Sequence, residues 1–294
     1  MSEQQTSHDN RIEAAGQLGA DGLPLTMHRP IVRFTNGAAP SGTEQLDDEV
    51  ASEYALTIYV NDRELATVVC TPEYMEDLVI GFLASEGVIR SIDQVESLTL
   101  SRLRGTARVK TKHAVNFNQD YYNKRYIASC CGKSRQTFYF TNDAHTAKYV
   151  DDDVQIHPDD VFRLMNQMEA SADLFRQTGG VHMAALCDTR QVLLGRTDIG
   201  RHNALDKLFG HALRTRVDLH GKLITFSGRL SSEVLLKVSK IGVGIVLAKS
   251  APTALAIEMA DELGITAVGF VRGKSFNVYT HPWRIVGAQP SASQ

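Results

Sequence analysis

The chain has 294 residues, of which 43% are hydrophobic and 22% are charged, the balance of an ordinary globular protein. Its net charge of -3 argues against a general nucleic-acid-binding protein, which needs a strongly basic face. No apolar run approaches the roughly 18 residues that span a membrane, and the start of the chain lacks the basic and apolar parts of a signal peptide. We therefore expect a cytoplasmic protein that binds neither nucleic acid nor membrane.

Four cysteines, Cys70, Cys130, Cys131 and Cys187, are scattered along the chain. They are too few for a disulfide scaffold, which a reducing cytosol would not support. The adjacent pair lacks the C-x-x-C spacing with which two thiolates hold one zinc ion, and no second pair completes four ligands. We therefore expect free thiols and no metal site.

The first strands follow a polar start. Residues 1–27 are polar and interrupted by glycines, so we expect a mobile tail there. Two β-rich runs, 55–60 and 65–70, flank the polar segment 61–64 and predict an antiparallel hairpin.

A helix is expected directly after this hairpin. Thr71 supplies a capping hydroxyl, Pro72 takes the first helical position, and Gly87 ends the apolar run. Two β-like stretches follow, at 95–100 and 107–115. Together these elements predict a small α+β domain over residues 28–115.

A long segment without clear periodicity comes next and contains the two adjacent cysteines. Loops of this length are uncommon in compact domains and are usually functional or disordered. We therefore predict a reactive cysteine loop and connector over residues 116–150.

Strand and helix patterns alternate over residues 151–285, beginning with a helix introduced by Pro158. Such alternation predicts an α/β domain, in which helices cover a sheet that is mixed or parallel in its later strands. Residues 286–294 are expected to form a tail. The expected strands are 181–187, 191–194, 222–226, 244–248, 265–271 and 277–280, and the expected later helices are 203–213, one through Val234 and Val238, and 252–263.

Cys131 is placed where a thiol would be reactive. It is followed by Gly132-Lys133-Ser134-Arg135, so two cations and free backbone N–H groups lie close to it in the sequence. Such surroundings lower the pKa of a thiol, and the thiolate is the form that accepts sulfur as a persulfide. Cys70 and Cys187 end strand-like runs and are expected to be small core residues.

Five motif runs occur in the later part of the chain, namely Thr178–Ala184, Asp198–Lys207, Ser227–Arg229, Lys249–Thr253 and Gly269–Gly273. In their order and composition they resemble the signatures of the FdhD formate dehydrogenase accessory proteins. The resemblance covers about residues 30–285. Its specificity comes from the number of motifs rather than from any one of them.

This resemblance implies a two-domain α/β protein whose larger domain is a three-layer domain similar to the cytidine-deaminase fold, with a smaller α+β N-terminal domain. It also implies a homodimeric sulfur carrier, which takes sulfur from a cysteine desulfurase and passes it to the molybdenum cofactor destined for formate dehydrogenase. That cofactor, Mo-bis(molybdopterin guanine dinucleotide), would be bound as a substrate. The cofactor-binding segment of the family corresponds here to Phe270, Val271, Arg272, Gly273, Lys274 and Ser275.

The chain departs from the family pattern in the cysteine loop. Many members carry a C-G-x-C motif, whereas this chain has Ser134 in place of the second cysteine. The resemblance therefore implies Cys131 as the persulfide carrier without a C-x-x-C partner. Cys130 could substitute for that partner, although vicinal cysteines form a disulfide only with strain. A neighbour without any chemistry is an equally weighted alternative.

The phosphates of such a cofactor need cations. The candidates lie mostly at the ends of expected strands, where open α/β sheets bind ligands and where helix N-termini and arginine side chains hold phosphate oxygens. Any one of them could instead be a solvated surface charge. They are Arg196, Arg201, Lys207, Arg229, Lys249, Arg272 and Lys274.

Two histidines and two aspartates complete the candidate residues. His182 and His202 titrate near neutrality, but such residues are more often hydrogen-bonded structural histidines. Asp198 and Asp206 could hold backbone N–H groups or a guanine edge. An active zinc deaminase would carry H-x-E and P-C-x-x-C motifs, and neither occurs, so we expect no deaminase chemistry even on a shared fold.

Sulfur transfer through a Cys131 persulfide is therefore the leading hypothesis. The main alternative is a chaperone that binds and delivers the molybdenum cofactor without covalent sulfur transfer. A nucleotide hydrolase is a weaker third possibility, because the chain lacks zinc ligands.

Overall fold

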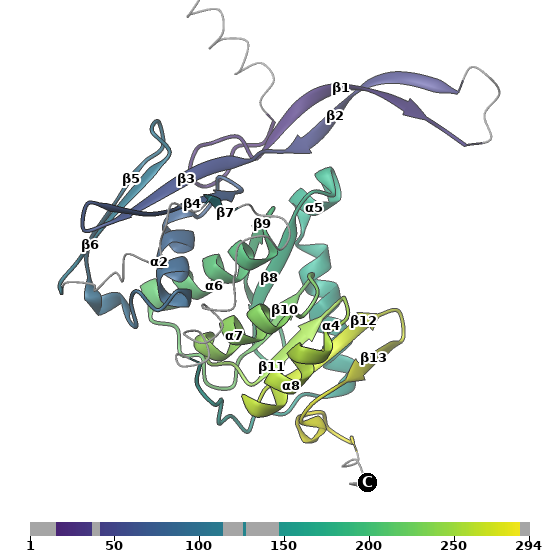
Figure 1. The fold of residues 1–294 in the computed structure, drawn as a ribbon. Coiled ribbons are helices and arrows are strands. Elements are labelled where there is room, and N and C mark those ends of the chain that lie inside the picture. The colour runs from purple at the N-terminus through teal and green to yellow at the C-terminus, as the bar shows by residue number, and fades with distance from the viewer. Residues whose placement is uncertain (1–15, 37–41, 114–125, 128–146, 289–294) are drawn as a thin grey trace, which may run out of the picture.

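The computed structural model forms a six-stranded sheet, a five-stranded sheet and a two-stranded ribbon in its described residues (Figure 1). Within these residues, no helix combines the length and the apolar character that crossing a bilayer requires. Cys130 and Cys131 lie outside the described part of the chain. The described ranges are 16–36, 42–113, 126–127 and 147–288.

The ribbon projects from one end of the body (Figure 1). It consists of β1 (Thr26–Phe34) and β2 (Thr43–Ala51), which are antiparallel. The chain before it also belongs to the fold, because Leu25 is only 3% exposed and packs in a small apolar cluster with Val69 and Leu174. The expected tail therefore does not include residues 16–27, where the apolar side chains of Leu23 and Leu25 pack against the body.

The five-stranded sheet has the order β5-β6-β3-β4-β7 and contains the predicted hairpin. Asn61 and Asp62 join β3 to β4 with φ angles of 49° and 64°, the backbone that a tight two-residue hairpin turn requires. Both later strands are also present, although the second ends at residue 111 instead of 115. The bounds are β3 Tyr54–Val60, β4 Arg63–Cys70, β5 Val95–Ser101, β6 Thr106–Thr111 and β7 Tyr126–Ile127, with a short 3-10 helix η1 at Ile92–Gln94.

The helix after the hairpin, α2 (Met75–Ser85), begins later than the sequence predicts. Thr71 does not cap it. The backbone N–H of Thr71 donates to Asp198 Oδ2 at 3.0 Å, and its hydroxyl accepts from the backbone N–H of Ile199 at 3.0 Å. The predicted cap is wrong because the hydroxyl binds a residue 128 positions away, which local sequence cannot reveal.

The six-stranded sheet has the order β13-β12-β11-β10-β8-β9. β10, β11 and β12 are parallel, whereas β8, β9 and β13 each pair antiparallel with a neighbour. The prediction of a mixed sheet with parallel later strands is therefore confirmed. The bounds are β8 His182–Cys187, β9 Val192–Asp198, β10 Leu223–Phe226, β11 Ile245–Ala248, β12 Thr266–Arg272 and β13 Ser275–Val278.

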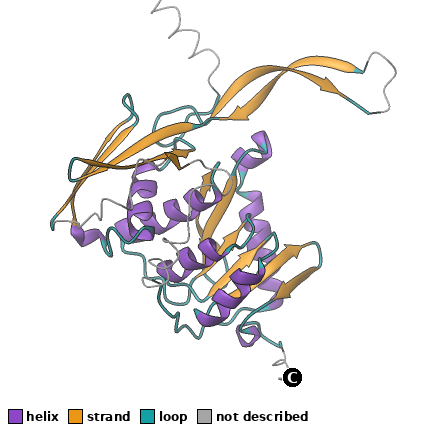
Figure 2. Cartoon of the chain, viewed as in Figure 1, coloured by secondary structure: helices purple, strands orange, loops and turns teal. Residues whose placement is uncertain are grey.

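Helices cover both faces of this sheet (Figure 2). Alternate strand residues face opposite sides, so Ala185 and Leu247 pack in the apolar cluster that contains α4, while Ala184 and Val246 pack in the cluster on the other face. Pro158 begins α4, as predicted. The bounds are α4 Pro158–Ala170, α5 Asp173–Thr178, α6 Arg201–Thr215, α7 Ser232–Ile241, α8 Ala254–Glu262 and the 3-10 helix η3 Pro282–Arg284.

Helices α2 and α6 cross at very short distance and join the two larger sheets. A Cβ atom added to Gly81 would lie 1.7 Å from the carbonyl oxygen of Asp206, and one added to Gly210 would lie 1.8 Å from that of Asp77. Only glycine fits at either position without moving a backbone. A single apolar core consequently runs from the five-stranded sheet through α2 and α6 to the six-stranded sheet.

Candidate functional site

The five motif runs meet along the boundary of the six-stranded sheet that is formed by the C-terminal ends of its parallel strands, which we call the sheet edge. The parallel strands β10, β11 and β12 end there, and the antiparallel strand β8 begins there with His182, opposite Asp198 at the end of β9. Helices α6, α7 and α8 start from the loops that follow. This is the edge at which open α/β sheets bind ligands.

His182 and Ser227 lie side by side at this edge. His182 Nδ1 is 3.4 Å from Ser227 Oγ, and the same hydroxyl accepts from the backbone N–H of Met183 at 2.9 Å. Burial lowers the pKa of His182, and the neighbouring Arg201 lowers it further, while Asp198 acts in the opposite direction. His182 is therefore a hydrogen-bonded histidine whose neutral form is favoured.

Arg201, the first residue of α6, lies beside the loop that follows β10. A Cβ atom added to Gly228 in that loop would be 3.4 Å from the Cβ atom of Arg201. The Nε atom of Arg201 is buried without a hydrogen-bond partner among the described residues, which is unusual for a guanidinium. Arg229 in the same loop is exposed. Arg229 is therefore accessible to an anion that binds at this edge, and Arg201 is partly exposed beside it.

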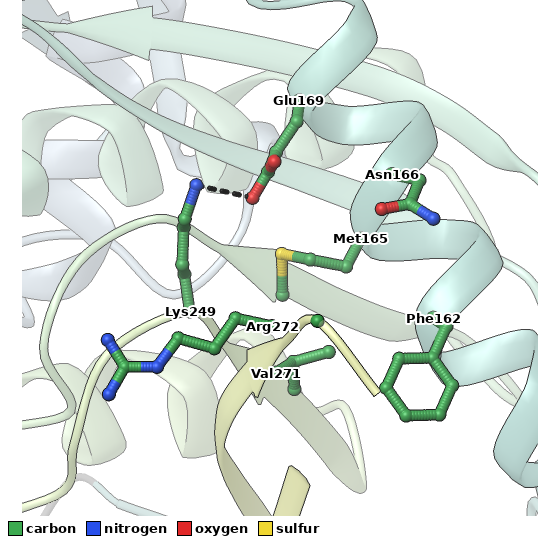
Figure 3. A pocket seen from close by; sticks show the side chains of 8 residues that line it. Phe162, Met165, Asn166, Glu169, Lys249, Val271 and Arg272 are labelled. Carbon is green, nitrogen blue, oxygen red and sulfur yellow. Dashed lines mark ion pairs between the residues drawn. The ribbon is translucent and has the colours of Figure 1, made fainter. Parts of the chain in front are cut away.

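A pocket of about 190 Å³ lies next to the turn between β12 and β13 (Figure 3). Lys249 lines it and forms an ion pair with Glu169 of α4, at 2.7 Å between Nζ and Oε1. Arg272 lines it as well. The pocket therefore combines two cations with one carboxylate, and the carboxylate already neutralises Lys249. The remaining lining residues are Phe162, Met165, Asn166, Val271 and Gly273.

The segment Phe270–Ser275 comprises the end of β12, the turn at Gly273 and Lys274, and the start of β13. Phe270 has a φ of 54° at a bulge between Gly269 and Arg272, a strained conformation for an aromatic residue. Val271 is buried, and the guanidinium carbon of Arg272 lies 5.0 Å from the centre of the Phe270 ring. The residues from Arg272 to Ser275 are exposed. The structure thus holds a cation-bearing turn beside the pocket.

Two of the candidate cations, Arg196 and Lys207, are buried inside the protein. Lys207 Nζ lies 2.7 Å from Asp198 Oδ2, with both side chains fully buried, and it also donates to two backbone carbonyls. Arg196 pairs with the buried Asp77 at 2.9 Å. These two candidates are therefore not available to a phosphate, because buried carboxylates already compensate their charges.

The two aspartates of the Asp198–Lys207 run hold the fold together. Asp198 accepts from the backbone N–H of Gly200 at 2.8 Å, besides its contacts with Thr71 and Lys207. Asp206 pairs with Lys237 at 2.5 Å and is 2% exposed. Asp198 therefore holds backbone N–H groups, one of the two roles that the sequence left open, whereas Asp206 bonds the side chains of Lys237 and Ser85.

His202 lies on the exposed side of the same run. Its Nε2 atom is 3.2 Å from Glu233 of α7, and both side chains are partly exposed. The contact ties the first turns of α6 and α7 together. His202 therefore contacts a carboxylate of the neighbouring helix near the edge.

Cys70 and Cys187 are buried core residues, as predicted. Burial raises the pKa of both thiols, to about 11 for Cys187, so both stay protonated near neutral pH. A buried neutral thiol is a poor nucleophile. Sulfur chemistry on a cysteine thus falls to Cys130 or Cys131, which lie outside the described residues.

The sequence did not predict that α4 lines the pocket. Asn166 and Glu169 are three residues apart, a spacing that places them on one helix face. That spacing could have marked them as a polar pair. It could not have shown that their face meets Lys249, which is distant in the sequence.

Another acidic group lies at the opposite edge of the sheet, beside the start of β10. Asp152, Asp153 and His220 bring possible ligand atoms within 4.8 Å of one another, and two of the three residues are exposed. Asp152 already accepts from the backbone N–H of Gly221 at 3.2 Å. We assign no metal to this group.

Comparison with known proteins agrees with the motif pattern. The model of the FdhD/NarQ family matches residues 51–286. The sulfur carrier protein FdhD of Bacillus subtilis (strain 168) is 52% identical over 261 residues, covering 89% of this chain and 98% of that protein. The protein of the same name from Listeria monocytogenes serotype 4b (strain F2365) is 49% identical over 259 residues, covering 88% and 98%.

The fold also matches a solved structure. A Desulfotalea psychrophila protein, provisionally assigned as a formate dehydrogenase accessory protein, superposes with a TM-score of 0.72 over 90% of this chain and 100% of that chain. At 24% identity this likeness shows the fold alone. The family match over most of the chain and the identity to relatives of nearly equal length lead to one conclusion: this chain belongs to the FdhD/NarQ family.

Proposed function

We propose that this chain is a sulfur carrier that accepts sulfur from a cysteine desulfurase as a Cys131 persulfide. It then transfers the sulfur to Mo-bis(molybdopterin guanine dinucleotide), which formate dehydrogenase requires. The observation that carries the proposal is the identity of about one half to relatives named sulfur carrier proteins, over nearly their whole length. The burial of Cys70 and Cys187 supports it by restricting the reactive thiols to the adjacent pair.

The first step is a thiolate exchange. The Cys131 thiolate attacks the terminal sulfur of the desulfurase persulfide, a new S–S bond forms, and the desulfurase cysteine leaves as a thiolate. In the second step the S–S bond breaks, Cys131 leaves as a thiolate with the bonding electron pair, and the terminal sulfur goes to the substrate cofactor, which in its reduced form would supply the two electrons that convert this sulfur to sulfide. Lys133 and Arg135 follow closely in the sequence, and their charges favour the thiolate at both stages. With Ser134 in the chain, the carrier works without a C-x-x-C disulfide.

The cofactor's guanine dinucleotide phosphates are proposed to bind at the sheet edge, through Arg201, Arg229, Lys249 and the segment Phe270–Ser275. The exposed cations of this segment and the unpartnered Nε atom of Arg201 support this placement. The proposal includes a cytoplasmic homodimer with a cytidine-deaminase-like larger domain. Helices on both faces of the six-stranded sheet agree with that domain type.

Mass spectrometry after incubation with a cysteine desulfurase and cysteine tests the proposal. We expect a sulfur-sized mass increase on the Cys131 peptide of the wild-type chain and of Cys187→Ala, and none on the corresponding peptide of Cys131→Ala. An unmodified Cys131 peptide, in a protein that still binds a guanine nucleotide, would instead establish the chaperone alternative.

Replacing one or the other partner of the ion pair in the pocket should change the affinity for GDP in opposite directions. Lys249→Gln should weaken GDP binding about tenfold, because a charge-assisted hydrogen bond to phosphate contributes roughly 1.5–3 kcal/mol. Glu169→Gln should strengthen it by up to about fivefold, because Lys249 no longer has a competing carboxylate and exposed ion pairs contribute roughly 0–1 kcal/mol. Isothermal titration calorimetry measures both. Lys222→Gln, at the opposite sheet edge, should leave the affinity unchanged; equal affinities for all three variants would remove Lys249 from the binding site.

A further inference from the structure

A second pocket, of about 380 Å³, lies beside β9, the last strand of the six-stranded sheet. The function proposed above uses none of its residues. Its volume falls in the range of roughly 300–1,000 Å³ that is usual for binding sites. The walls come from β9, from the start of α5, and from two segments close to the starts of β1 and α2. The fold therefore brings four distant parts of the chain together around one cavity.

The floor of this pocket is apolar and closely packed. Leu25 and Leu174 line it, are buried, and belong to one small apolar cluster. Met183 is buried as well and lies over Gly195, because a Cβ atom added to that glycine would be 2.3 Å from the Met183 Cε atom. Removing apolar surface from water is favourable. The floor is therefore suited to a ligand group with an aliphatic part.

The charged residues of the pocket are both acidic. Glu73 and Asp173 line it, and none of the described lining residues is lysine, arginine or histidine. Asp173 pairs with Arg176 of the same helix. Glu73 accepts from the backbone N–H of Ala20 at 3.3 Å and forms no ion pair within the described part of the chain. A positively charged group therefore complements the pocket, with Glu73 as its partner.

Tyr74 adds an aromatic wall next to this carboxylate. It lines the pocket and has a φ of 53°, a strained backbone for an aromatic residue. Such strain persists only where the surrounding structure holds it, and it is frequent at binding sites. The guanidinium carbon of Arg196 lies 3.8 Å from the centre of the Tyr74 ring, and the charge of Arg196 is compensated by the buried Asp77. The ring is therefore held in place beside a carboxylate that lacks a cation.

Large apolar side chains are exposed around the pocket. Leu193 lines it and is 43% exposed. Leu18 and Phe175 directly follow the lining residues Gln17 and Leu174 in the chain and are 62% and 47% exposed. Exposed apolar residues that gather around a polar site mark protein interaction surfaces, and a small free cation would leave them uncovered. The occupant that fits is consequently part of another protein.

We propose that the pocket receives an arginine side chain of a partner protein, and that apolar residues next to this arginine cover Leu18, Phe175 and Leu193. The guanidinium donates to the Glu73 carboxylate and packs beside the Tyr74 ring, while its aliphatic stem lies on the apolar floor. Arginine suits this combination because its planar guanidinium both stacks on aromatic rings and forms two parallel hydrogen bonds to a carboxylate. Arginine anchors of this kind contribute much of the binding energy of many interfaces.

A short peptide that carries only these features tests the proposal. The probe is acetyl-Ser-Leu-Arg-Leu-Ser-amide, titrated into the full-length protein by isothermal titration calorimetry. The same peptide with citrulline in place of arginine, which keeps the shape and removes the charge, should bind at least about tenfold more weakly. Glu73→Gln should weaken binding of the arginine peptide about tenfold, and Leu193→Ser about threefold, because the first removes the carboxylate and the second removes apolar contact.

The matched controls change the same residue types on the hairpin of β5 and β6. Glu96→Gln and Leu103→Ser, the latter at a side chain that is 99% exposed, should leave the affinity for the arginine peptide unchanged. Circular dichroism should show the wild-type fold for all four variants, and sedimentation velocity should show the wild-type oligomeric state.

Three results would overturn the proposal. Equal affinities for the arginine and citrulline peptides, or an unchanged affinity in Glu73→Gln, would remove the charged anchor. Binding of ethylguanidine alone as tightly as the peptide would make the pocket a site for a small cation. A changed oligomeric state in Glu73→Gln or Leu193→Ser would mean that a second copy of the chain, and not a different protein, covers the pocket.

Discussion

Formate dehydrogenase activity should fall to the level of carrier-deficient cells when Cys131 is replaced by alanine. The side chain is the proposed site of the persulfide, and alanine offers no sulfur to accept or release. The described cysteines cannot replace it, because Cys70 and Cys187 are buried and burial raises the pKa of both thiols. The measurement is formate oxidation in extracts of cells whose only copy of the carrier is the variant.

Two other cysteine variants make this result specific. Cys187→Ala should keep most of the activity, because that thiol lies in the core at the opposite edge of the sheet from the motif runs. Cys130→Ala shows whether the adjacent thiol participates: full activity means a single persulfide carrier, and a loss means a two-cysteine relay. Full activity in Cys131→Ala would rule out Cys131 as the carrier.

Lys207→Met should lower the free energy of unfolding by about 3–5 kcal/mol, the usual cost of removing one partner from a buried ion pair. The substitution leaves the carboxylate of Asp198 buried without a countercharge, since both side chains are fully buried in the wild-type chain. Urea unfolding followed by circular dichroism gives the difference. Because Lys207 is not exposed to ligand, the loss should appear in stability and not in nucleotide affinity at temperatures where the variant is folded.

An exposed ion pair provides the comparison. Arg216 and Asp93 pair at 2.6 Å with side chains that are 69% and 62% exposed, so Arg216→Ala should change the free energy of unfolding by less than about 1 kcal/mol. Adding Asp198→Asn to Lys207→Met should recover part of the loss, because it removes the uncompensated charge. A Lys207→Met variant as stable as Arg216→Ala would show that the buried pair contributes little.

Most helices and strands could be predicted from the sequence because their signals are local. The apolar run that forms β8, and Pro158 at the start of α4, are signals carried by neighbouring residues. Thr71 shows the limit of such signals. Its hydroxyl and a following proline satisfy every local rule for a helix cap, yet the hydroxyl binds the backbone of Ile199.

The candidate site shows the same limit for charged residues. Arg196 and Arg272 both follow or end strand-like runs, and nothing in their neighbouring residues separates them. Arg196 is buried against Asp77, which lies 119 positions away, whereas Arg272 is exposed at a turn. Whether a cation is available to a ligand depends on such distant partners. The motif order could identify the sheet edge, but it could not say which cations there remain accessible.

The close crossing of α2 and α6 restricts how the molecule can enclose a ligand. Many proteins close two lobes around a bound molecule by rotation about a hinge. Here the backbones touch at Gly81 and Gly210, and Thr71 is tied to the end of β9, so such a rotation would have to pull apart a continuous core. Within the described residues, a dinucleotide that binds at the sheet edge, as proposed above, is therefore met by side chains and surface turns rather than by rotation of the two larger sheets.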